Sequence, residues 1–240
     1  GASRSHLARP DETGLRRLGT DRIDVLFVHR FDEETALHET LRALDDLVRQ
    51  GKVLYLGASN FAAWQVMKAL GRQRREGWTP FHVLQPMYNL AKRQAEVEIL
   101  PMAQSENLGV LSYSPLGGGL LTGKYGRDRR PDEGRLVDNK MYQTRYGADV
   151  HYEVAERFTE FARTHGYNPV PLAVAWVAHH PTITAPIIGA RTLDQLAGSL
   201  GALEIDMTAD LYEAISDLAP TPPPATDRVE ERSKHTYGSR

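Results

Sequence analysis

The feature that most constrains the fold is a repeated alternation of short apolar segments with amphipathic helical stretches. β-prone runs begin at residues 23, 53, 81 and 109, and a further run covers residues 185–188. The first four begin 28 to 30 residues apart, about the length of one strand–helix unit. Repeated units of this kind predict an α/β protein with a parallel sheet and right-handed crossovers, either doubly wound or closed as a barrel.

Helical periodicity fills the intervals between these runs. Leucines at positions 37, 41, 44 and 47 share one face of a predicted helix over 34–50, which Gly51 would cap. His179 and His180 are predicted to cap a helix before Pro181, and Thr208 is a predicted N-cap. One further predicted helix carries Trp64, Met67 and Leu70, and another carries Val97, Leu100 and Ala103. Four more are predicted over residues 149–165, 171–180, 192–202 and 208–217.

Two segments lack this periodicity. Residues 125–146 are rich in Arg, Asp and Gly, and we expect a long loop on the face where α/β proteins build their sites. The tail 220–240 is rich in proline and charge, and we expect an extended surface segment there. The predicted domain therefore covers residues 1–219.

Composition excludes several classes of protein. Of the 240 residues, 41% are hydrophobic and 25% charged, and the net charge of −2 gives no reason to expect nucleic acid or a membrane as partner. The absence of cysteine excludes disulfides and thiolate metal sites and is typical of a reducing, cytoplasmic location. The nine histidines show no spacing typical of a metal site.

Polar residues follow the predicted strands at equivalent ends. Ligands of parallel α/β proteins bind beyond the carboxyl ends of the strands, so these residues predict a site. Each also has a structural interpretation: a lone His is as often structural, and Asn60 could cap the following helix. The residues concerned are His29, Ser59 and Asn60, Gln85, Tyr113 and Ser114, and Gly189 to Arg191.

Several motifs, in the same order along the chain, resemble the aldo-keto reductase family. Gly57–Phe61 is similar to the family's G-x-S-N-F signature, and Gln85–Asn89 and Tyr113–Tyr125 are similar to the sixth and seventh strands with their loops. Further similar segments are Leu18–Asp24, Val28–Arg30, Ala43–Val48, Gly51–Val53, Ile187–Arg191 and Gln195–Leu196.

The resemblance implies a (β/α)8 TIM barrel that binds NADP(H) and reduces a small-molecule aldehyde or ketone. His29 would be the catalytic histidine that orients the carbonyl, Ser59, Asn60 and Gln85 would bind the carboxamide, and Tyr113 would stack on the nicotinamide. Arg191 would contact the 2′-phosphate, which favours NADPH over NADH. The remaining cofactor-binding residues implied are Ser114, Leu116, Gly118, Gly123 and Lys124 at the pyrophosphate, and Ile188, Gly189, Ala190, Gln195 and Ser199 toward the adenosine.

Alternatives to these assignments stay open. Tyr113 could be a packing aromatic, Lys124 a solvated charge, and Gly117–Gly119 only a turn. At the family's acidic and Asn positions near the adenine, this chain has Gly198 and Ser199. A weaker grip on the adenine is therefore expected.

The family's catalytic Asp, Tyr and Lys lie before the histidine strand. Here only 22 residues precede the first predicted strand, and they contain neither Tyr nor Lys. Together with Gly1 as first residue, this predicts strands four to eight of a barrel, a fragment inactive alone. The alternatives are a non-catalytic cofactor-binding protein resembling the potassium-channel β subunits, or an unrelated barrel lyase or isomerase. The physiological substrate and the oligomeric state are not indicated.

Overall fold

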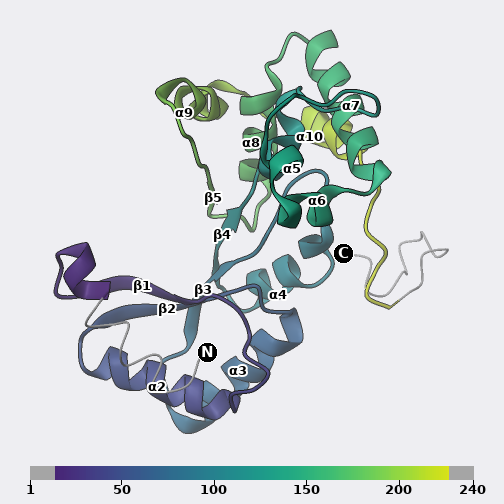
Figure 1. The fold of residues 1–240 in the computed structure, drawn as a ribbon. Coiled ribbons are helices and arrows are strands. Elements are labelled where there is room, and N and C mark those ends of the chain that lie inside the picture. Colours follow the sequence, from purple (N-terminus) through teal and green to yellow (C-terminus); the bar gives the residue numbers. More distant parts are fainter. Residues whose placement is uncertain (1–13, 227–240) are drawn as a thin grey trace. The chain divides into compact units, whose positions relative to one another are not determined.

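The computed structural model describes residues 14–226 of the chain (Figure 1). The strands are β1 Ile23–Val28, β2 Val53–Ser59, β3 Phe81–Gln85, β4 Gly109–Tyr113 and β5 Ala185–Ile187. The α-helices are α2 Leu37–Arg49, α3 Ala63–Glu76, α4 Ile99–Ser105, α5 Arg135–Asp138, α6 Lys140–Tyr146, α7 Asp149–Thr164, α8 Pro169–His179, α9 Leu193–Leu200 and α10 Ala209–Ser216. Short 3-10 helices are η1 Gln94–Glu96, η2 Gly117–Thr122 and η3 Gly201–Glu204.

All strand pairings are parallel, and the strands pair in their order along the chain, β1-β2-β3-β4-β5. Each pair is connected through at least one helix, as parallel crossover units require. This confirms the predicted α/β class and all five predicted strands.

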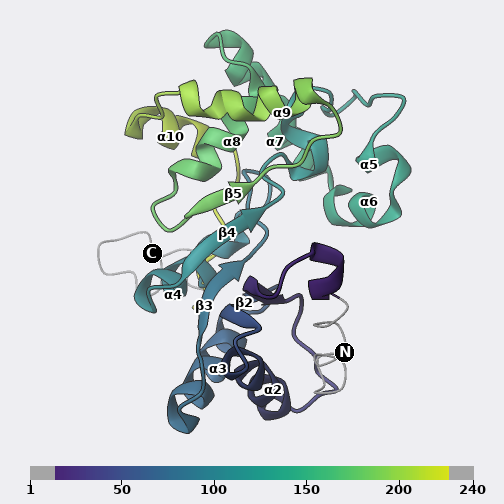
Figure 2. The ribbon, with the colours of Figure 1, turned by 90° about the vertical axis from the view of Figure 1, so that its left-hand side faces the viewer.

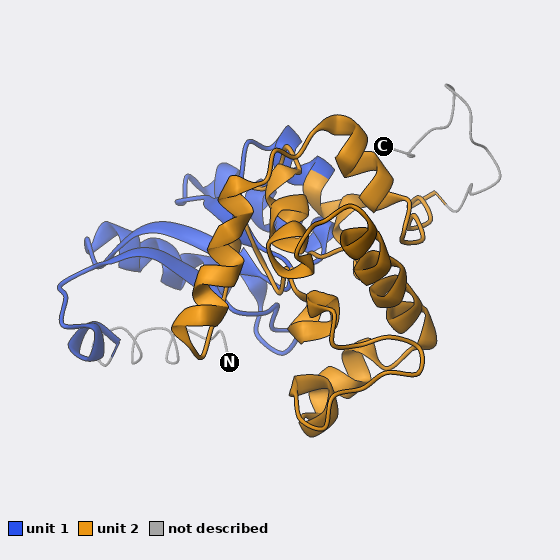
Figure 3. Ribbon diagram, turned by 90° about the horizontal axis from the view of Figure 1, so that it is seen from above, with its two compact units in different colours: residues 1–86, 101–110 blue, residues 87–100, 111–240 orange. Residues whose placement is uncertain are grey.

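The chain divides into two compact units (Figure 3). Unit 1 comprises residues 1–86 and 101–110, and unit 2 comprises residues 87–100 and 111–240. Strand β4 contributes to both, because its first residues pair with β3 and its last three pair with β5.

Unit 1 packs α2 and α3 side by side (Figure 1). Leu41, Leu44 and Leu47 of α2 are buried, which confirms the predicted apolar face. In the helix α3, however, Trp64 is 59% exposed, and the buried residues include Val66, Leu70 and Gln73. The helix predicted to carry Trp64, Met67 and Leu70 is therefore present, with Leu70 on its buried face and Trp64 on its exposed face.

Unit 2 packs around α8. All residues from Pro171 to Val177 are buried, so the helix is apolar all round over this stretch and has no solvent face there. It contacts α7, α9, α10 and β5, and Figure 2 shows α8 beside β5. Trp176 stacks between Tyr88 and Tyr212, with ring centroids 5.3 and 5.5 Å away.

Helix α2 begins at Leu37, three residues later than predicted. The Asp32 carboxylate explains the delay, because Oδ1 accepts from the Glu34 amide at 3.1 Å and Oδ2 from the Thr35 hydroxyl at 2.8 Å. An Asp side chain that bonds its own following backbone stabilises a turn at the expense of helix.

The prediction of a long loop over 125–146 is wrong for the C-terminal half of this segment, which forms α5 and α6. The Asn139 side chain accepts from the Met141 amide at 3.0 Å and so caps α6. Leu136 of α5 and Tyr146 of α6 are buried, and the burial of these two side chains holds both short helices in place.

Three predicted caps are confirmed. Gly51 follows α2 in a left-handed conformation, the Thr208 hydroxyl accepts from the Leu211 amide at 3.2 Å, and His180 ends α8. The predicted tail begins within the described residues at Pro220–Thr226, where it forms no helix or strand, and its residues 227–240 lie outside them. Between residues 14 and 226, no helix combines the length and apolarity needed to cross a membrane.

Candidate functional site

The predicted residues of unit 1 come together at the carboxyl ends of β1, β2 and β3. The Ser59 hydroxyl donates to the backbone carbonyl of Gln85 at 2.9 Å. The Asn60 Nδ2 donates to the carbonyl of His29 at 2.8 Å and to the Ser59 Oγ at 3.0 Å. One short network therefore joins three strand ends, through bonds between residues that are 26 and 31 positions apart in sequence.

Asn60 has a left-handed backbone with φ of +57°, which an Asn tolerates better than most residues. The alternative that Asn60 caps α3 is wrong. Ala62 occupies the cap position, and its amide donates to the Gln65 Oε1 at 2.8 Å. The Asn60 amide is thus directed across the strand ends rather than into the helix.

His29 and Asn60 are exposed, Gln85 is half-buried and Ser59 is fully buried. Among residues 14–226, no hydrogen bond is made by the side-chain amide of Gln85 or by the imidazole of His29. A half-buried primary amide in this state suits a bound carboxamide, because both groups donate and accept.

In unit 2, Tyr113 ends β4 and Ser114 turns the chain away. Ser114 has φ of +60°, and Gly117, Gly118 and Gly119 follow with φ values of +58°, +70° and +106°. The backbone thus leaves the strand in a tight turn, which brings amide groups close together. Such a turn is suited to phosphate binding.

Gly118 is required by a close approach as well as by its conformation. A Cβ atom there would lie 2.6 Å from the Cδ1 of Tyr142 on α6. Leu116 is half-buried, and Gly123 ends η2 in a left-handed conformation with Lys124 exposed beside it. The segment predicted to wrap the pyrophosphate is therefore covered on one side by α6.

The residues after β5 lie on the surface of unit 2. Ile188 is half-buried, while Gly189, Ala190 and Arg191 are exposed. The Gln195 Oε1 accepts from the backbone amide of Arg191 at 2.9 Å, and the Arg191 guanidinium makes no ion pair with residues 14–226. Ser199 is buried at 3% exposure, unlike the exposed Gln195 and Arg191.

A cationic group, Arg145, lies near Tyr113. Burial raises the pKa of its hydroxyl, and the nearby Arg145 acts in the opposite direction. Burial also lowers the pKa of Lys92, and Arg145 lowers it further. Arg145 is half-buried beside Tyr142, with its guanidinium carbon 5.5 Å from the ring centroid, whereas Arg127, Arg129 and Arg130 of the same segment are exposed.

Two residues of unit 2 that sequence reasoning assigned no role, Asn89 and Tyr146, lie at this turn. The Asn89 Nδ2 donates to the Ser114 carbonyl and to the Tyr146 hydroxyl, both at 3.0 Å. Asn89 belongs to the Gln85–Asn89 motif, but the motif does not predict its contacts, which depend on tertiary packing. Within residues 14–226, no group of three or more His, Asp or Glu residues could hold a metal ion.

Comparison with known proteins identifies the family. The model of the "Aldo/keto reductase family" matches residues 1–220. The chain is 36% identical to the uncharacterized oxidoreductase YrpG of Bacillus subtilis over 225 residues, 92% of this chain and 66% of that protein. It is also 36% identical to aflatoxin B1 aldehyde reductase member 2 of Mus musculus over 208 residues, 80% of this chain and 57% of that protein.

A third relative is aldo-keto reductase family 7 member A3 of Homo sapiens, 35% identical over 210 residues, 80% of this chain and 63% of that protein. The chain thus spans between about half and two thirds of the length of these relatives. The family match covers all five strands and every predicted site residue. The chain belongs to the aldo/keto reductase family.

Proposed function

We propose that this chain supplies the cofactor-binding part of an NADPH-dependent reductase that converts an aldehyde or ketone to an alcohol. The observation that carries the proposal is the network of Ser59, Asn60 and the Gln85 carbonyl at three strand ends, beside a Gln85 amide that has no partner among residues 14–226. The names of the relatives, which include aldehyde reductases, agree with it.

The residues present fit this cofactor in their chemistry. Asn60 and Gln85 suit the carboxamide, Tyr113 suits a flat ring, and the turn from Ser114 to Gly119 suits phosphate oxygens. The exposed guanidinium of Arg191 suits the 2′-phosphate, a charge-assisted bond absent with NADH. When bound, NADPH supplies the hydride.

Within this proposal, the roles of the chain's own residues are binding and orientation. Ser59 fixes Gln85 through its carbonyl, and Asn60 fixes the strand end that carries His29. His29 is exposed, so its imidazole is available to hydrogen-bond a substrate carbonyl and orient it. The other predicted cofactor contacts remain proposals: Leu116, Gly118, Gly123, Lys124, Ile188, Gly189, Ala190, Gln195 and Ser199.

No residue of this chain matches the family's catalytic Asp, Tyr or Lys. The Tyr is the group that would protonate the carbonyl oxygen, and without it the barrier to hydride transfer stays high. We therefore propose that the chain alone binds NADPH without reducing a carbonyl, as strands four to eight of the barrel. Its predicted cytoplasmic location rests on the absence of cysteine.

A direct test follows NADPH fluorescence and absorbance with the full chain and an aromatic aldehyde. We expect saturable binding and no aldehyde-dependent oxidation of NADPH. Oxidation above the buffer rate would refute the proposed inactivity, and lack of binding would refute the cofactor assignment. The same protein, binding NADPH without turnover, also fits the alternative of a non-catalytic family member that serves a partner.

The Gln85→Leu variant tests the carboxamide contact. It keeps the backbone carbonyl that Ser59 needs but removes the amide, so we expect NADPH binding about tenfold weaker. The matched control is Gln104→Leu, because Gln104 is an exposed residue of α4 outside the site. Equal affinities of the two variants would contradict the contact.

A further inference from the structure

Asn89 is completely buried, and both the amide nitrogen and the amide oxygen of its side chain form hydrogen bonds. Its Nδ2 donates to the Ser114 carbonyl and the Tyr146 hydroxyl, and its Oδ1 accepts from the Ala91 amide at 3.1 Å. Asn has two amide hydrogens, and both are used here. A buried polar side chain with this many partners specifies one arrangement of the backbone around it.

The arrangement that it specifies is the turn after β4. Ser114 has φ of +60°, a left-handed conformation that costs free energy in a residue with a Cβ. The amide of Tyr88 donates to the Tyr113 carbonyl at 3.2 Å, and the next residue, Asn89, binds the next carbonyl, Ser114. Two consecutive residues therefore hold the carbonyls on both sides of the strained position.

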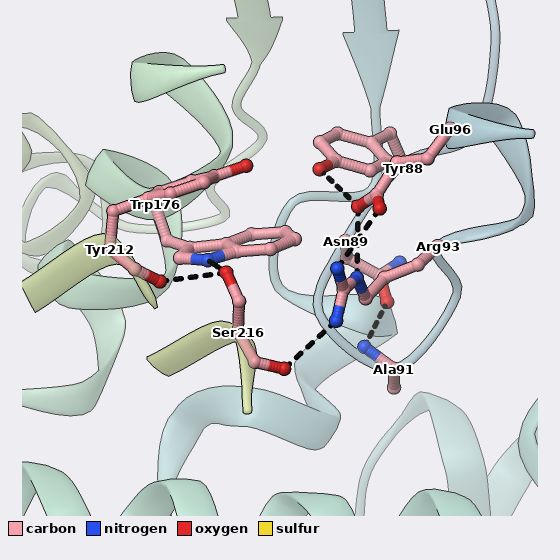
Figure 4. Close-up of polar contacts among 8 residues, drawn as sticks. All are labelled: Tyr88, Asn89, Ala91, Arg93, Glu96, Trp176, Tyr212 and Ser216. Atoms are coloured by element: carbon pink, nitrogen blue, oxygen red, sulfur yellow. Dashed lines mark hydrogen bonds and ion pairs between the residues drawn. The ribbon is translucent and has the colours of Figure 1, made fainter. Parts of the chain in front are cut away.

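Residues 88 and 89, which bind these two carbonyls, belong to a segment that is itself fixed to the helices of unit 2 (Figure 4). The Tyr88 hydroxyl donates to Glu96 at 2.7 Å, and the Arg93 guanidinium binds both oxygens of Glu96 at 2.9 and 3.0 Å. Arg93 also donates to the Ser216 carbonyl at 2.8 Å at the end of α10. Burial holds the pKa of Tyr88 far above its ordinary value, with Glu96 adding to the shift, so this hydroxyl remains a donor.

The side of the turn opposite β4 is fixed in the same way. Tyr146 on α6 is buried, and its hydroxyl accepts from Asn89 and contacts the Met87 sulfur at 3.6 Å. The ring of Tyr146 packs against Gly117, whose Cβ position would lie 3.6 Å from Cε1. Asn89 thus lies between the start of the turn and the helix that covers it.

We propose that Asn89 is a positioning residue that sets the Tyr113 ring for cofactor binding by holding Ser114 in its left-handed conformation. The inference rests on the proposed function, because Tyr113 is there the ring that stacks on the nicotinamide. Asn89 itself touches neither cofactor nor substrate. Its contribution passes through the Ser114 carbonyl.

The experiment compares two ligands for the full chain with Asn89→Ala and Asn89→Asp. The first ligand is NADPH, and the second is adenosine 2′,5′-bisphosphate, which has no nicotinamide and no pyrophosphate. Both variants lose the donor to Ser114, so we expect about tenfold weaker NADPH binding, the equivalent of one strained residue. Binding of the bisphosphate should change less than about twofold.

A matched control separates positioning from general loss of stability. Ser216→Ala removes the hydroxyl that accepts from the Trp176 indole at 3.0 Å, a bond that involves neither Asn89 nor Ser114, and it keeps the Ser216 carbonyl that Arg93 binds. We expect this variant to lower the unfolding midpoint without changing the ratio of the two affinities. If Ser216→Ala shifts that ratio as much as Asn89→Ala does, the proposal is overturned.

Rescue by glycine tests the route through Ser114. Gly adopts φ near +60° without the Cβ penalty, so in a Ser114→Gly background Asn89→Ala should weaken NADPH binding by less than about threefold. An undiminished effect in that background would overturn the proposal. If an Asn89 variant fails to fold, adding Ser114→Gly to that variant must restore a cooperative unfolding transition, and no recovery refutes the role.

The outcomes distinguish this inference from the proposed function. If the wild-type chain binds neither ligand, or binds the bisphosphate at least as tightly as NADPH, the cofactor assignment fails. If the wild-type chain binds NADPH and the Asn89 variants bind it equally well, only the positioning role fails.

Discussion

At the scale of single residues, buried polar side chains decide how the elements of each unit meet. Asp45 of α2 is 2% exposed, and its Oδ1 accepts from the amide of Thr79 at 2.9 Å and its hydroxyl at 3.0 Å. Gln73 of α3 is fully buried and binds the Thr79 carbonyl and the Phe81 amide. These two side chains replace the backbone partners that the segment before β3 lacks.

Asp45→Asn should lower the free energy of unfolding by about 1–3 kcal/mol, because one carboxylate oxygen becomes an amide NH2 group that faces the donors of Thr79 or Arg49. Burial alone would raise the pKa of Asp45, but hydrogen bonds from Thr79 and Arg49 hold it below its ordinary value. Its contribution is therefore present above about pH 4 and is lost on acidification. Denaturant unfolding at neutral pH measures the change.

The neighbouring residue gives the control for that variant. Asp46 lies on the same helix and pairs with Arg42 at 3.2 Å on the surface. Asp46→Asn should cost less than about 1 kcal/mol. Equal losses of unfolding free energy in the two variants would show that the burial of Asp45 does not increase its contribution to stability.

Gly118→Ala should destabilise the chain by about 1–3 kcal/mol, since φ of +70° and the Tyr142 ring both oppose a Cβ. Gly71→Ala is the opposite case, because Gly71 lies in α3 with no atom within 4 Å of its Cβ position. We expect that variant to gain roughly 0.5–1 kcal/mol. Thermal unfolding of both proteins provides the measurement, and a stabilised Gly118→Ala would contradict the close approach.

At the scale of elements, sequence period and caps predicted most of the architecture. The five strands are found where apolar β-prone runs occur, although most residues of β1 and β5 are half-buried or exposed rather than buried. Helices α5 and α6 were missed, since Asn139 and two apolar contacts define them rather than a repeating pattern. The strand-end residues were predictable as a set, but the carbonyls that Asn60 and Asn89 bind were not, because such contacts depend on tertiary packing.

The end of α8 makes the stability of the chain depend on pH. The His180 Nδ1 accepts from the Thr182 amide at 3.2 Å, which requires an unprotonated nitrogen. Burial lowers the pKa of His180, and Arg93 and His179 act in the same direction, while Glu96 opposes them. A lowered pKa in the folded state means that stability is full above about pH 6.5 and falls as the pH decreases.

His180→Gln should therefore reduce the difference in melting temperature between about pH 7.5 and about pH 5.5. His179→Gln is the matched control, because His179 is its exposed neighbour. Melting curves at the two pH values test the pair. A pH dependence that is the same in both variants would assign the acid sensitivity to other groups, such as His82 and His151, whose pKa burial also lowers.

At the scale of the whole molecule, the two units each carry part of the proposed cofactor chemistry. Unit 1 holds His29, Ser59, Asn60 and Gln85, whereas unit 2 holds the Tyr113 turn and Arg191. Motif similarity predicted both sets, because each lies at the carboxyl end of a strand where the family's motifs are dense. Asn89, which supports the turn in unit 2, lies within one of those motifs, whereas Tyr142 and Tyr146, which also contact the turn, lie outside them.

We propose that this chain binds NADPH, with Arg191 on the 2′-phosphate. The most direct measurement is a calorimetric titration of the full chain with NADPH and, separately, with NADH. We predict saturable binding of NADPH that is about tenfold tighter than the binding of NADH, the effect of one charge-assisted contact. No saturable binding would contradict the cofactor assignment, and equal affinity for the two nucleotides would contradict the role of Arg191.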